Sequence, residues 1–288
     1  MTRTEQFTRF VRQHWDGNEQ RWFQALADQG WTAIDWPVTL GGTGWSRPDQ
    51  LAFITALAVH GCPLMPESLT VIAPLLLQVG TTSQKENYLA SIRQSPLDWG
   101  LGFAPGSPGA MRCRHICIRT ERSDGLYNLE IVTGNNSESE HEHEQLGQPG
   151  KALLHLATCT SAILLLHESK TGIQHIHDMN NHWQLEERNE VSELEVGQSA
   201  LEGLFLKATK KNDAHLALAV QRSRLNLFST LFQSLGYYAL LNPDPALSDN
   251  EPLPFSRQRN HLQDLRKRVD RDEMIQQDLM FQEFLASE

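Results

Sequence analysis

The chain has 288 residues, of which 40% are hydrophobic and 21% are charged, and its formal net charge is -10 at pH 7. This composition indicates a soluble globular protein with enough apolar material for a sizeable core, and it excludes a disordered, collagen-like or coiled-coil chain. The negative charge repels phosphate backbones and anionic lipid heads, so we expect neither nucleic acid nor a membrane surface as a partner.

The cysteine count and the N-terminal segment predict a reduced, cytoplasmic protein. Four cysteines in a chain of this length do not form a dense disulfide framework, and residues 1–15 contain no apolar signal core. The longest apolar stretch, 152–166, is interrupted by polar residues and falls short of the roughly 20 residues that a membrane helix needs. We therefore expect no transmembrane segment.

Residues 1–95 have the pattern of a helical domain. Apolar residues at helical spacing before Gly30, and again over 51–58, predict two amphipathic helices on either side of a turn-rich stretch. Ser46 with Asp49, and Ser83 with Glu86, have the spacing of a capping box, in which a hydroxyl satisfies a free backbone N–H and the acid reaches back. Each serine is therefore predicted to open a helix.

Residues 96–211 have the pattern of a middle β domain. Short segments with alternating or continuous apolar residues are separated by Gly, Asp, Asn and Ser clusters, which favours strands. These segments are 113–121, 126–133, 152–167 and 171–177. The acidic stretch 183–196 is more typical of solvated strand faces or loops than of a core.

A helical pattern returns at Asn212 and continues through 288. Residues 214–241 predict a long apolar helix, 242–254 are a proline-rich break, and 255–287 predict a second, strongly charged helix. The predicted fold class is therefore α+β, with an N-terminal helical domain, a middle β-barrel-like domain and a C-terminal helical segment.

Two passages of the N-terminal region carry a family resemblance. A Leu-x-x-x-Gly-Trp segment leads through a Trp-Pro pair into a Gly-Gly-x-Gly turn and a capped helix. Its residues are Leu26, Gly30, Trp31, Trp36, Pro37, Gly41, Gly42, Gly44 and Ser46. The second passage consists of Pro74, Leu75, Leu76, Gly80, Thr81, Gln84 and Lys85. Over residues 15–95 the chain resembles the acyl-CoA dehydrogenase family.

The resemblance implies a fold of a helical domain, a middle β domain and a C-terminal helical bundle, with FAD and an acyl-CoA thioester between them. In that family a carboxylate removes a proton from the substrate while the flavin takes a hydride. Compared with the family, the helical region 212–288 is short, and we interpret it as truncated.

The resemblance also places two flavin-contacting segments in the chain. In the family's Phe-Ser/Thr-Glu-Pro-x-x-Gly-Ser-Asp loop, Phe103 and Gly109 match, while alanines stand at two hydroxyl positions. In a second passage only a glycine is retained, and Glu138 stands where the family has a stacking tryptophan. These correspondences imply five vestigial cofactor-binding positions: Phe103, Ala104, Gly109, Ala110 and Gly134.

No residue matches the catalytic carboxylate that the resemblance requires. There is no Asp or Glu from 214 to 243, where a minority of the family carries its base, and the family's C-terminal cofactor segments are absent. The resemblance therefore implies a pseudoenzyme: a non-catalytic or partner subunit of an acyl-CoA dehydrogenase assembly, paired with a full-length dehydrogenase subunit or with its own copy as a homo-oligomer. The alternative is an FAD-dependent acyl-CoA dehydrogenase, a CH–CH oxidoreductase, active alone or with a full-length partner. Binding of acyl-CoA without chemistry is a third interpretation.

Two histidine pairs resemble metal ligands. His141-x-His143 and His175-x-His177 would each place two imidazoles on one face of a strand, with nearby glutamates supplying oxygen. A hydrophilic, solvated segment explains the same residues, and because structural zinc sites have more regular spacing and cysteine ligands, we expect no metal.

The remaining motifs are interpreted as structural. Cys113 and Cys117 are predicted to lie in a core strand, and Cys62 to pack after a helix. The run 41–44 lacks the strand and lysine of a phosphate loop and predicts a turn with positive φ. The arginines and lysine of 257–271 alternate with acids, as on a solvated, ion-paired helix face.

Overall fold

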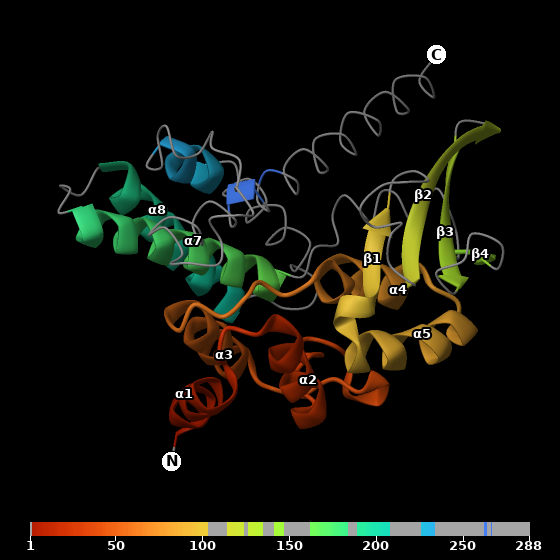
Figure 1. Cartoon of the computed structure of the whole chain (residues 1–288), viewed down its shortest axis with the longest axis horizontal. Helices are drawn as coiled ribbons and strands as arrows, with labels where there is room; N and C mark the ends of the chain where they lie inside the picture. The colour runs from red at the N-terminus through yellow and green to blue at the C-terminus, as the bar shows by residue number, and fades with distance from the viewer. Residues whose placement is uncertain are drawn as a thin grey trace.

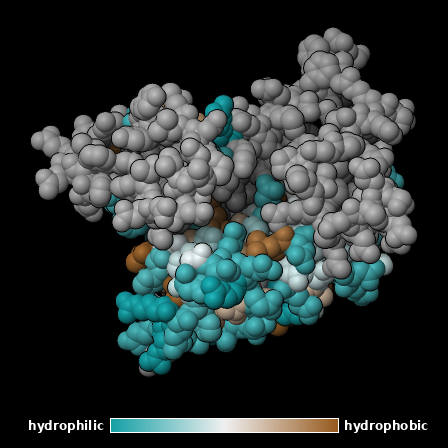
Figure 2. All heavy atoms as spheres, in the orientation of Figure 1, coloured by the Kyte–Doolittle hydropathy of each residue, from teal (hydrophilic) through white to brown (hydrophobic). Residues whose placement is uncertain are grey.

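The computed structural model describes residues 2–102, 114–123, 126–134, 141–146, 162–183, 189–207, 226–233, 262–263 and 266. Figure 1 shows the five helices of the first 95 residues as one body, with a β-sheet standing over α4 and α5 and the long helix α7 lying across α3. The surface over α1–α5 is mostly hydrophilic in this view, as Figure 2 shows.

The N-terminal body consists of five α-helices joined by short turns. They are α1 (Arg3–His14), α2 (Glu19–Gln29), α3 (Arg47–Val59), α4 (Ala73–Val79) and α5 (Thr82–Gln94). Three single-turn elements connect them: η1 (Val38–Leu40), η2 (Ser68–Ile72) and η3 (Pro96–Asp98). The predicted helical domain over residues 1–95 is therefore confirmed in its secondary structure.

One of the two predicted helix starts is confirmed and the other is wrong. The hydroxyl of Ser46 accepts a hydrogen bond from the backbone N–H of Asp49 and opens α3. α5, however, begins after Thr81, whose side chain forms a capping box with Gln84. Ser83 lies inside the first turn because Thr81 and Gln84 already satisfy the free backbone groups.

Four aromatic rings join α1 and α3 to the segment that precedes α3. Phe7, Trp31, Trp45 and Phe53 contact one another in all six pairs, with ring centroids 4.8 to 5.7 Å apart. Phe7 and Phe53 are fully buried. Tilted and edge-to-face pairs at this separation add stability beyond the area they bury, so this cluster is the centre of the N-terminal core.

The turn at 41–44 is confirmed as one that requires glycine. Gly41 and Gly44 have φ values of +87° and +66°, in the left-handed region. Gly42 is needed for a different reason: a Cβ added there would lie 1.9 Å from the carbonyl oxygen of Trp36. The turn is thus folded back tightly on residues 33–37.

A four-stranded sheet follows the N-terminal body. Its strands are β1 (Trp99–Gly102), β2 (Arg114–Ser123), β3 (Leu126–Gly134) and β4 (His141–Gln145), in the order β1-β2-β3-β4. β1 pairs with β2 in parallel, and the other two pairs are antiparallel. The strands predicted at 113–121 and 126–133 are confirmed, whereas closure of the sheet into a barrel stays a prediction.

Hydrogen bonds from α5 anchor the last strand of the sheet. Gln84 donates to Glu144 Oε1 at 3.0 Å and to the carbonyl oxygen of Gln145 at 2.8 Å, and the hydroxyl of Tyr88 donates to Glu144 Oε2 at 2.5 Å. Because Gln84 also caps α5, one buried side chain connects the helix start with the sheet.

The chain after the sheet is helical where β structure was predicted. α7 spans Ala162–Trp183 and α8 spans Asn189–Lys207. The strand predicted at 171–177 is therefore wrong, and so is the strand predicted over 162–167. Residues 189–196 of the acidic stretch are helical, not strand or loop. The buried apolar residues Leu166, Ile173 and Ile176 recur at helical intervals, and this longer period outweighs the local alternation over 171–177.

Beyond α8, the described residues agree with the helices predicted from the sequence. Residues 226–233, within the predicted helix 214–241, are helical, and Leu227 and Leu231 pack against Ile173 and Ile176 of α7. Residues 262–263 and 266, within the predicted helix 255–287, are also helical. The proline-rich break 242–254 lies outside the described residues, and the domain limits at 95 and 211 stay predictions.

None of the helices that the structure describes combines the length and apolar character needed to span a bilayer.

Cys62 packs into the core, as predicted, with 2% of its surface exposed. Burial raises the pKa of its thiol from 9.0 to about 12. Because the folded-state pKa is raised, the corresponding stability is fully present below pH 9 and is lost as the pH rises toward 12.

We therefore expect native Cys62 to resist alkylation at pH 8 to 9, where an unfolded thiol of pKa 9.0 reacts. Peptide-resolved mass spectrometry after iodoacetamide treatment, with and without urea, measures this protection. The Cys62→Ala variant should lose less stability than the parent chain between pH 9 and 11. Rapid labelling of Cys62 without urea would contradict the assignment.

Candidate functional site between α3, α7 and α8

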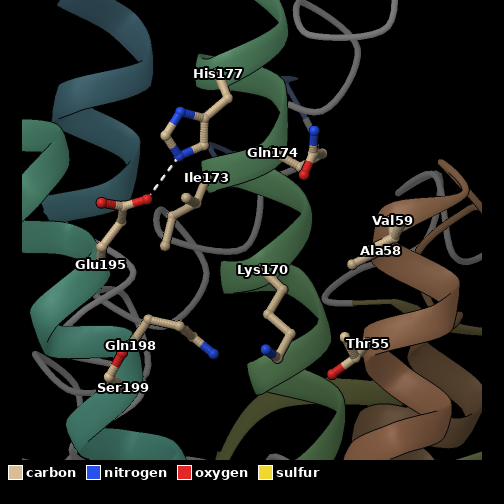
Figure 3. Close-up of a pocket in the computed structure, with 10 residues that line it drawn as sticks. All are labelled: Thr55, Ala58, Val59, Lys170, Ile173, Gln174, His177, Glu195, Gln198 and Ser199. Carbon is tan, nitrogen blue, oxygen red and sulfur yellow. Dashed lines mark hydrogen bonds and ion pairs between the residues drawn. The ribbon is translucent and has the colours of Figure 1, made fainter. Parts of the chain in front are cut away.

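A pocket of about 270 Å³ lies where α7 crosses α3 and α8 (Figure 3). The lining comes from the last two turns of α3, from the middle of α7 and from one face of α8. The lining residues are Thr55, Ala58, Val59, Lys170, Ile173, Gln174, His177, Glu195, Gln198 and Ser199. Helices that are far apart in the sequence, α3 ending at Val59 and α8 beginning at Asn189, thus form one site.

The lysine and the histidine of the pocket each contact a carboxylate of α8. His177 Nε2 lies 2.8 Å from Glu195 Oε1, as the dashed line in Figure 3 shows. Lys170 Nζ pairs with Glu202 Oε1, which also accepts a hydrogen bond of 3.1 Å from Gln198 Nε2. Because the Lys170 and Glu202 side chains are only 17% and 25% exposed, water screens their attraction less than that of a surface pair.

The pocket also has apolar lining residues, which come from α3 and α7. Ala58 and Ile173 are buried, while Val59, the last residue of α3, is 60% exposed. The hydroxyl of Thr55 donates to the carbonyl oxygen of Leu51 at 2.8 Å, within its own helix. The site therefore combines apolar residues of α3 and α7 with polar residues of all three helices, a mixture that small-molecule pockets also show.

Each of the three titratable lining residues has a partner. Lys170 pairs with Glu202, and His177 pairs with Glu195. A general base for proton abstraction needs a carboxylate or imidazole within hydrogen-bond reach of the substrate and available to accept the proton. Among the residues that line this pocket, none is a carboxylate without a partner. The imidazole among the lining residues, His177, is held by the carboxylate of Glu195 at 2.8 Å.

Of the five predicted flavin-contacting positions, the structure describes Gly134. Phe103, Ala104, Gly109 and Ala110 lie outside the described residues. Gly134 ends β3 and pairs with His141 of β4, and it is absent from the pocket lining. Their role with FAD stays a prediction.

The histidine pairs differ in outcome. His141 and His143 both lie in the strand β4, as predicted. His175 and His177 lie in α7 instead, where two positions differ by about 200° around the axis, so the prediction that they share a strand face is wrong. Among the residues whose placement is described, no group of three or more His, Cys, Asp or Glu is arranged to hold a metal ion.

Sequence reasoning missed this pocket because it assigned α7 to the β domain. The signal was present: Gln174 and Asp178 form an i to i+4 hydrogen bond of 3.0 Å, as do Gln198 and Glu202 at 3.1 Å. Such polar pairs at a spacing of four residues are typical of helices. Cys113, the first of the predicted core cysteines, lies outside the described residues.

Comparison with known proteins agrees with the resemblance found in the N-terminal residues. The family described as "Acyl-CoA dehydrogenase, N-terminal domain" matches residues 4–95. Acyl-CoA dehydrogenase FadE26 of Mycobacterium tuberculosis is 36% identical over 85 residues, which is 30% of this chain and 21% of FadE26. The chain thus spans about a fifth of the length of that curated relative.

Solved structures extend the likeness beyond the N-terminal domain at the level of the fold. The ChsE4-ChsE5 complex from Mycobacterium tuberculosis contains a chain with a TM-score of 0.57 and 16% identity, over 96% of both chains. The FAD complex of PigA has a TM-score of 0.58 and 12% identity, over 95% of this chain and 97% of that one.

The fold is therefore of the acyl-CoA dehydrogenase type. Residues 4–95 match the N-terminal domain of the acyl-CoA dehydrogenase family in sequence, and over 97% of its length the chain is similar in fold to solved proteins such as an acyl-CoA dehydrogenase from Geobacillus kaustophilus, with a TM-score of 0.55 and 11% identity.

Proposed function

We propose that the chain is a partner subunit of a heteromeric acyl-CoA dehydrogenase assembly, and that it supplies structure rather than the catalytic base. The observation that carries this proposal is an exposed apolar face on α8. Val196 is 72% exposed and Leu204 is 55% exposed, and eight residues of helix place both on the same side.

An exposed apolar helix face in a folded protein commonly marks a protein interface. The α8 face, defined by Val196 and Leu204, is suited to a partner that offers an apolar surface of its own. A dehydrogenase chain is the occupant we favour, because the ChsE4-ChsE5 complex, which shares the fold over 96% of both chains, is by its name an assembly of two different subunits.

The chemistry of the chain supports a non-catalytic role in such an assembly. The pocket between α3, α7 and α8 holds no carboxylate without a partner among its lining residues. In the sequence, Ala104 and Ala110 replace hydroxyl side chains of the flavin loop, so those positions cannot donate side-chain hydrogen bonds. FAD and acyl-CoA would then be held chiefly by the partner.

A flavin-binding enzyme is the second candidate, and the FAD complex of PigA favours it because that protein has the same fold. On this reading the backbone around Phe103 and Gly109 binds the cofactor without the missing hydroxyls. The two candidates differ in whether the isolated chain retains FAD.

The test is to purify the chain alone and after co-expression with full-length acyl-CoA dehydrogenases of its own organism. We expect the isolated chain to be colourless after incubation with FAD and desalting. We expect a mixed complex in size-exclusion chromatography with light scattering, and a flavin absorption band only in that complex. A stable flavin band in the isolated chain would instead support the enzyme.

Two acidic substitutions on the α8 face, Val196→Asp with Leu204→Asp, should abolish the complex, because each places a charge in an apolar contact. The matched control is Val38→Asp, at a residue of η1 that is 67% exposed and lies in the N-terminal body. The control should assemble like the parent chain. Assembly that survives the α8 substitutions would show that the partner docks elsewhere.

A further inference from the structure

The α8 face is the middle of a longer stripe of residues along one side of the helix. At about 100° per residue, the stripe occupies roughly 120° of the circumference, away from the buried Leu201 and Phe205. Its members are all exposed except Gly203, which is partly exposed; they are Glu193, Val196, Gly197, Ala200, Gly203, Leu204 and Lys207. The pocket residues Glu195 and Gln198 project toward α7 from a different side of the helix, as Figure 3 shows.

The stripe is symmetric in its chemistry about Ala200. At equal distances on either side of Ala200 stand two glycines, then two branched apolar residues, then two charges of opposite sign. The pairs are Gly197 with Gly203, Val196 with Leu204, and Glu193 with Lys207. In a two-fold contact, residue i of one copy meets residue j of the other, and j meets i. A two-fold axis at Ala200 therefore places each residue of the stripe opposite a residue of matching character.

The charges at the two ends determine the direction of such a pair. When the helices run antiparallel, Glu193 of each copy lies opposite Lys207 of the other. When they run parallel, Glu193 would face Glu193 and Lys207 would face Lys207, and like charges opposed across an interface disfavour it. The stripe thus selects the antiparallel arrangement.

The small residues at the centre of the stripe allow the two helices to approach closely. Interaxial distances of packed helices are about 8–10 Å and depend on the side chains at the contact. Among the residues that the structure describes, no atom lies within 4 Å of the place that a Cβ of Gly197 or Gly203 would take. Close approach brings Val196 of one copy against Leu204 of the other and removes both from water, which is favourable.

We propose that α8 pairs antiparallel with α8 of a second copy of this chain, across a two-fold axis at Ala200. The contact runs about 21 Å along the helix, from Glu193 to Lys207. Because each copy contributes a single helix, the interface is smaller than the standard of about 1,600 Å², and the dimer forms reversibly. The self-pair is the state of the chain when no other subunit covers the stripe.

The self-pair and the proposed dehydrogenase complex use the same face, so each excludes the other. The self-pairing does not depend on the proposed function, whereas displacement of the second copy by a dehydrogenase subunit rests on it. The two have separate tests: the oligomeric state of the isolated chain decides the first, and co-expression decides the second. A monomer that still forms the mixed complex would overturn the self-pair alone.

Sedimentation velocity of the isolated chain over a range of concentrations measures the dimer, and a cysteine at the axis locates it. The Cα atoms of a disulfide lie about 4.4–6.8 Å apart, so Ala200→Cys should give a disulfide-linked dimer under copper–phenanthroline oxidation. Ser199→Cys, at the neighbouring exposed residue, is the matched control and should crosslink no more than the parent chain, which gives the background from native cysteines. A monomer at every concentration, or equal crosslinking of the two variants, would overturn the proposal.

Charge reversal tests the antiparallel direction. Each dimer contains the Glu193–Lys207 contact twice, so Glu193→Lys or Lys207→Glu alone should weaken the dimer about tenfold. The double variant, Glu193→Lys with Lys207→Glu, restores opposite charges at both ends and should dimerise like the parent chain. Both residues are exposed, so neither reversal disturbs the core. Failure of the double variant to recover the dimer would refute the antiparallel pairing.

Discussion

Replacing Phe53 with alanine is expected to lower the free energy of unfolding by about 3–5 kcal/mol. Phe53 is fully buried on α3 and its ring contacts Phe7, Trp31 and Trp45, with centroids 5.1 to 5.7 Å away. The substitution leaves a cavity at the centre of the aromatic cluster and removes three ring pairs at once. Because domains are stable by only about 5–15 kcal/mol, one such change brings the chain close to unfolding.

Urea unfolding followed by tryptophan fluorescence measures this loss, because Trp31 and Trp45 report directly on the cluster. Val59→Ala is the matched control on the same helix. Val59 is 60% exposed, so its truncation should change the free energy of unfolding by less than about 0.5 kcal/mol. Equal effects of the two substitutions would show that the aromatic cluster is not the centre of the N-terminal core.

The sequence predicts the N-terminal body well because its limits are local features. Gly30 ends α2 in the left-handed conformation, and Ser46 caps α3 through its own hydroxyl. Both signals act within four residues of where they stand. The error at Ser83 arose because Thr81 and Gln84 offer a second, competing cap two residues earlier, and sequence alone does not rank the two.

The region after the sheet is harder to predict because two periodicities overlap there. Over 171–177, Ile173, His175 and His177 occupy alternate positions, but the buried Ile176 does not fit that pattern, and across the whole of α7 the buried positions follow the helical repeat. A window of about seven residues favours a strand, whereas a window of about twenty residues favours a helix. The shorter window led to the incorrect β assignment.

The pocket was beyond prediction for a different reason. Thr55 and Ala58 come from α3, whereas Lys170 and Gln198 come from helices more than 100 residues later. Each of these residues has an ordinary role in its own helix, and only packing brings them together.

Replacing Gly42 with alanine should destabilise the chain by about 3 kcal/mol, near the upper end for overpacking. The new Cβ would lie 1.9 Å from the carbonyl oxygen of Trp36, and a backbone oxygen cannot move aside as a flexible side chain does. The Gly42 N–H also donates to the carbonyl oxygen of Pro37 at 3.1 Å, so relief of the clash would break the turn that leads into α3. Thermal unfolding by circular dichroism measures the effect.

Gly30→Ala separates this steric effect from the cost of an unusual backbone conformation. Gly30 has a φ of +73° but open space around it, so alanine there should cost only about 1 kcal/mol, the strain of a left-handed residue with a Cβ. Gly42, in the same N-terminal body, shows the reverse combination. Its φ lies outside the left-handed region, but backbone atoms occupy the space that a Cβ would need. If Gly30→Ala destabilised the chain more than Gly42→Ala, the close approach of the turn to Trp36 would be refuted. The expected order instead means that contact with the Trp36 carbonyl, rather than a backbone angle, fixes glycine at position 42.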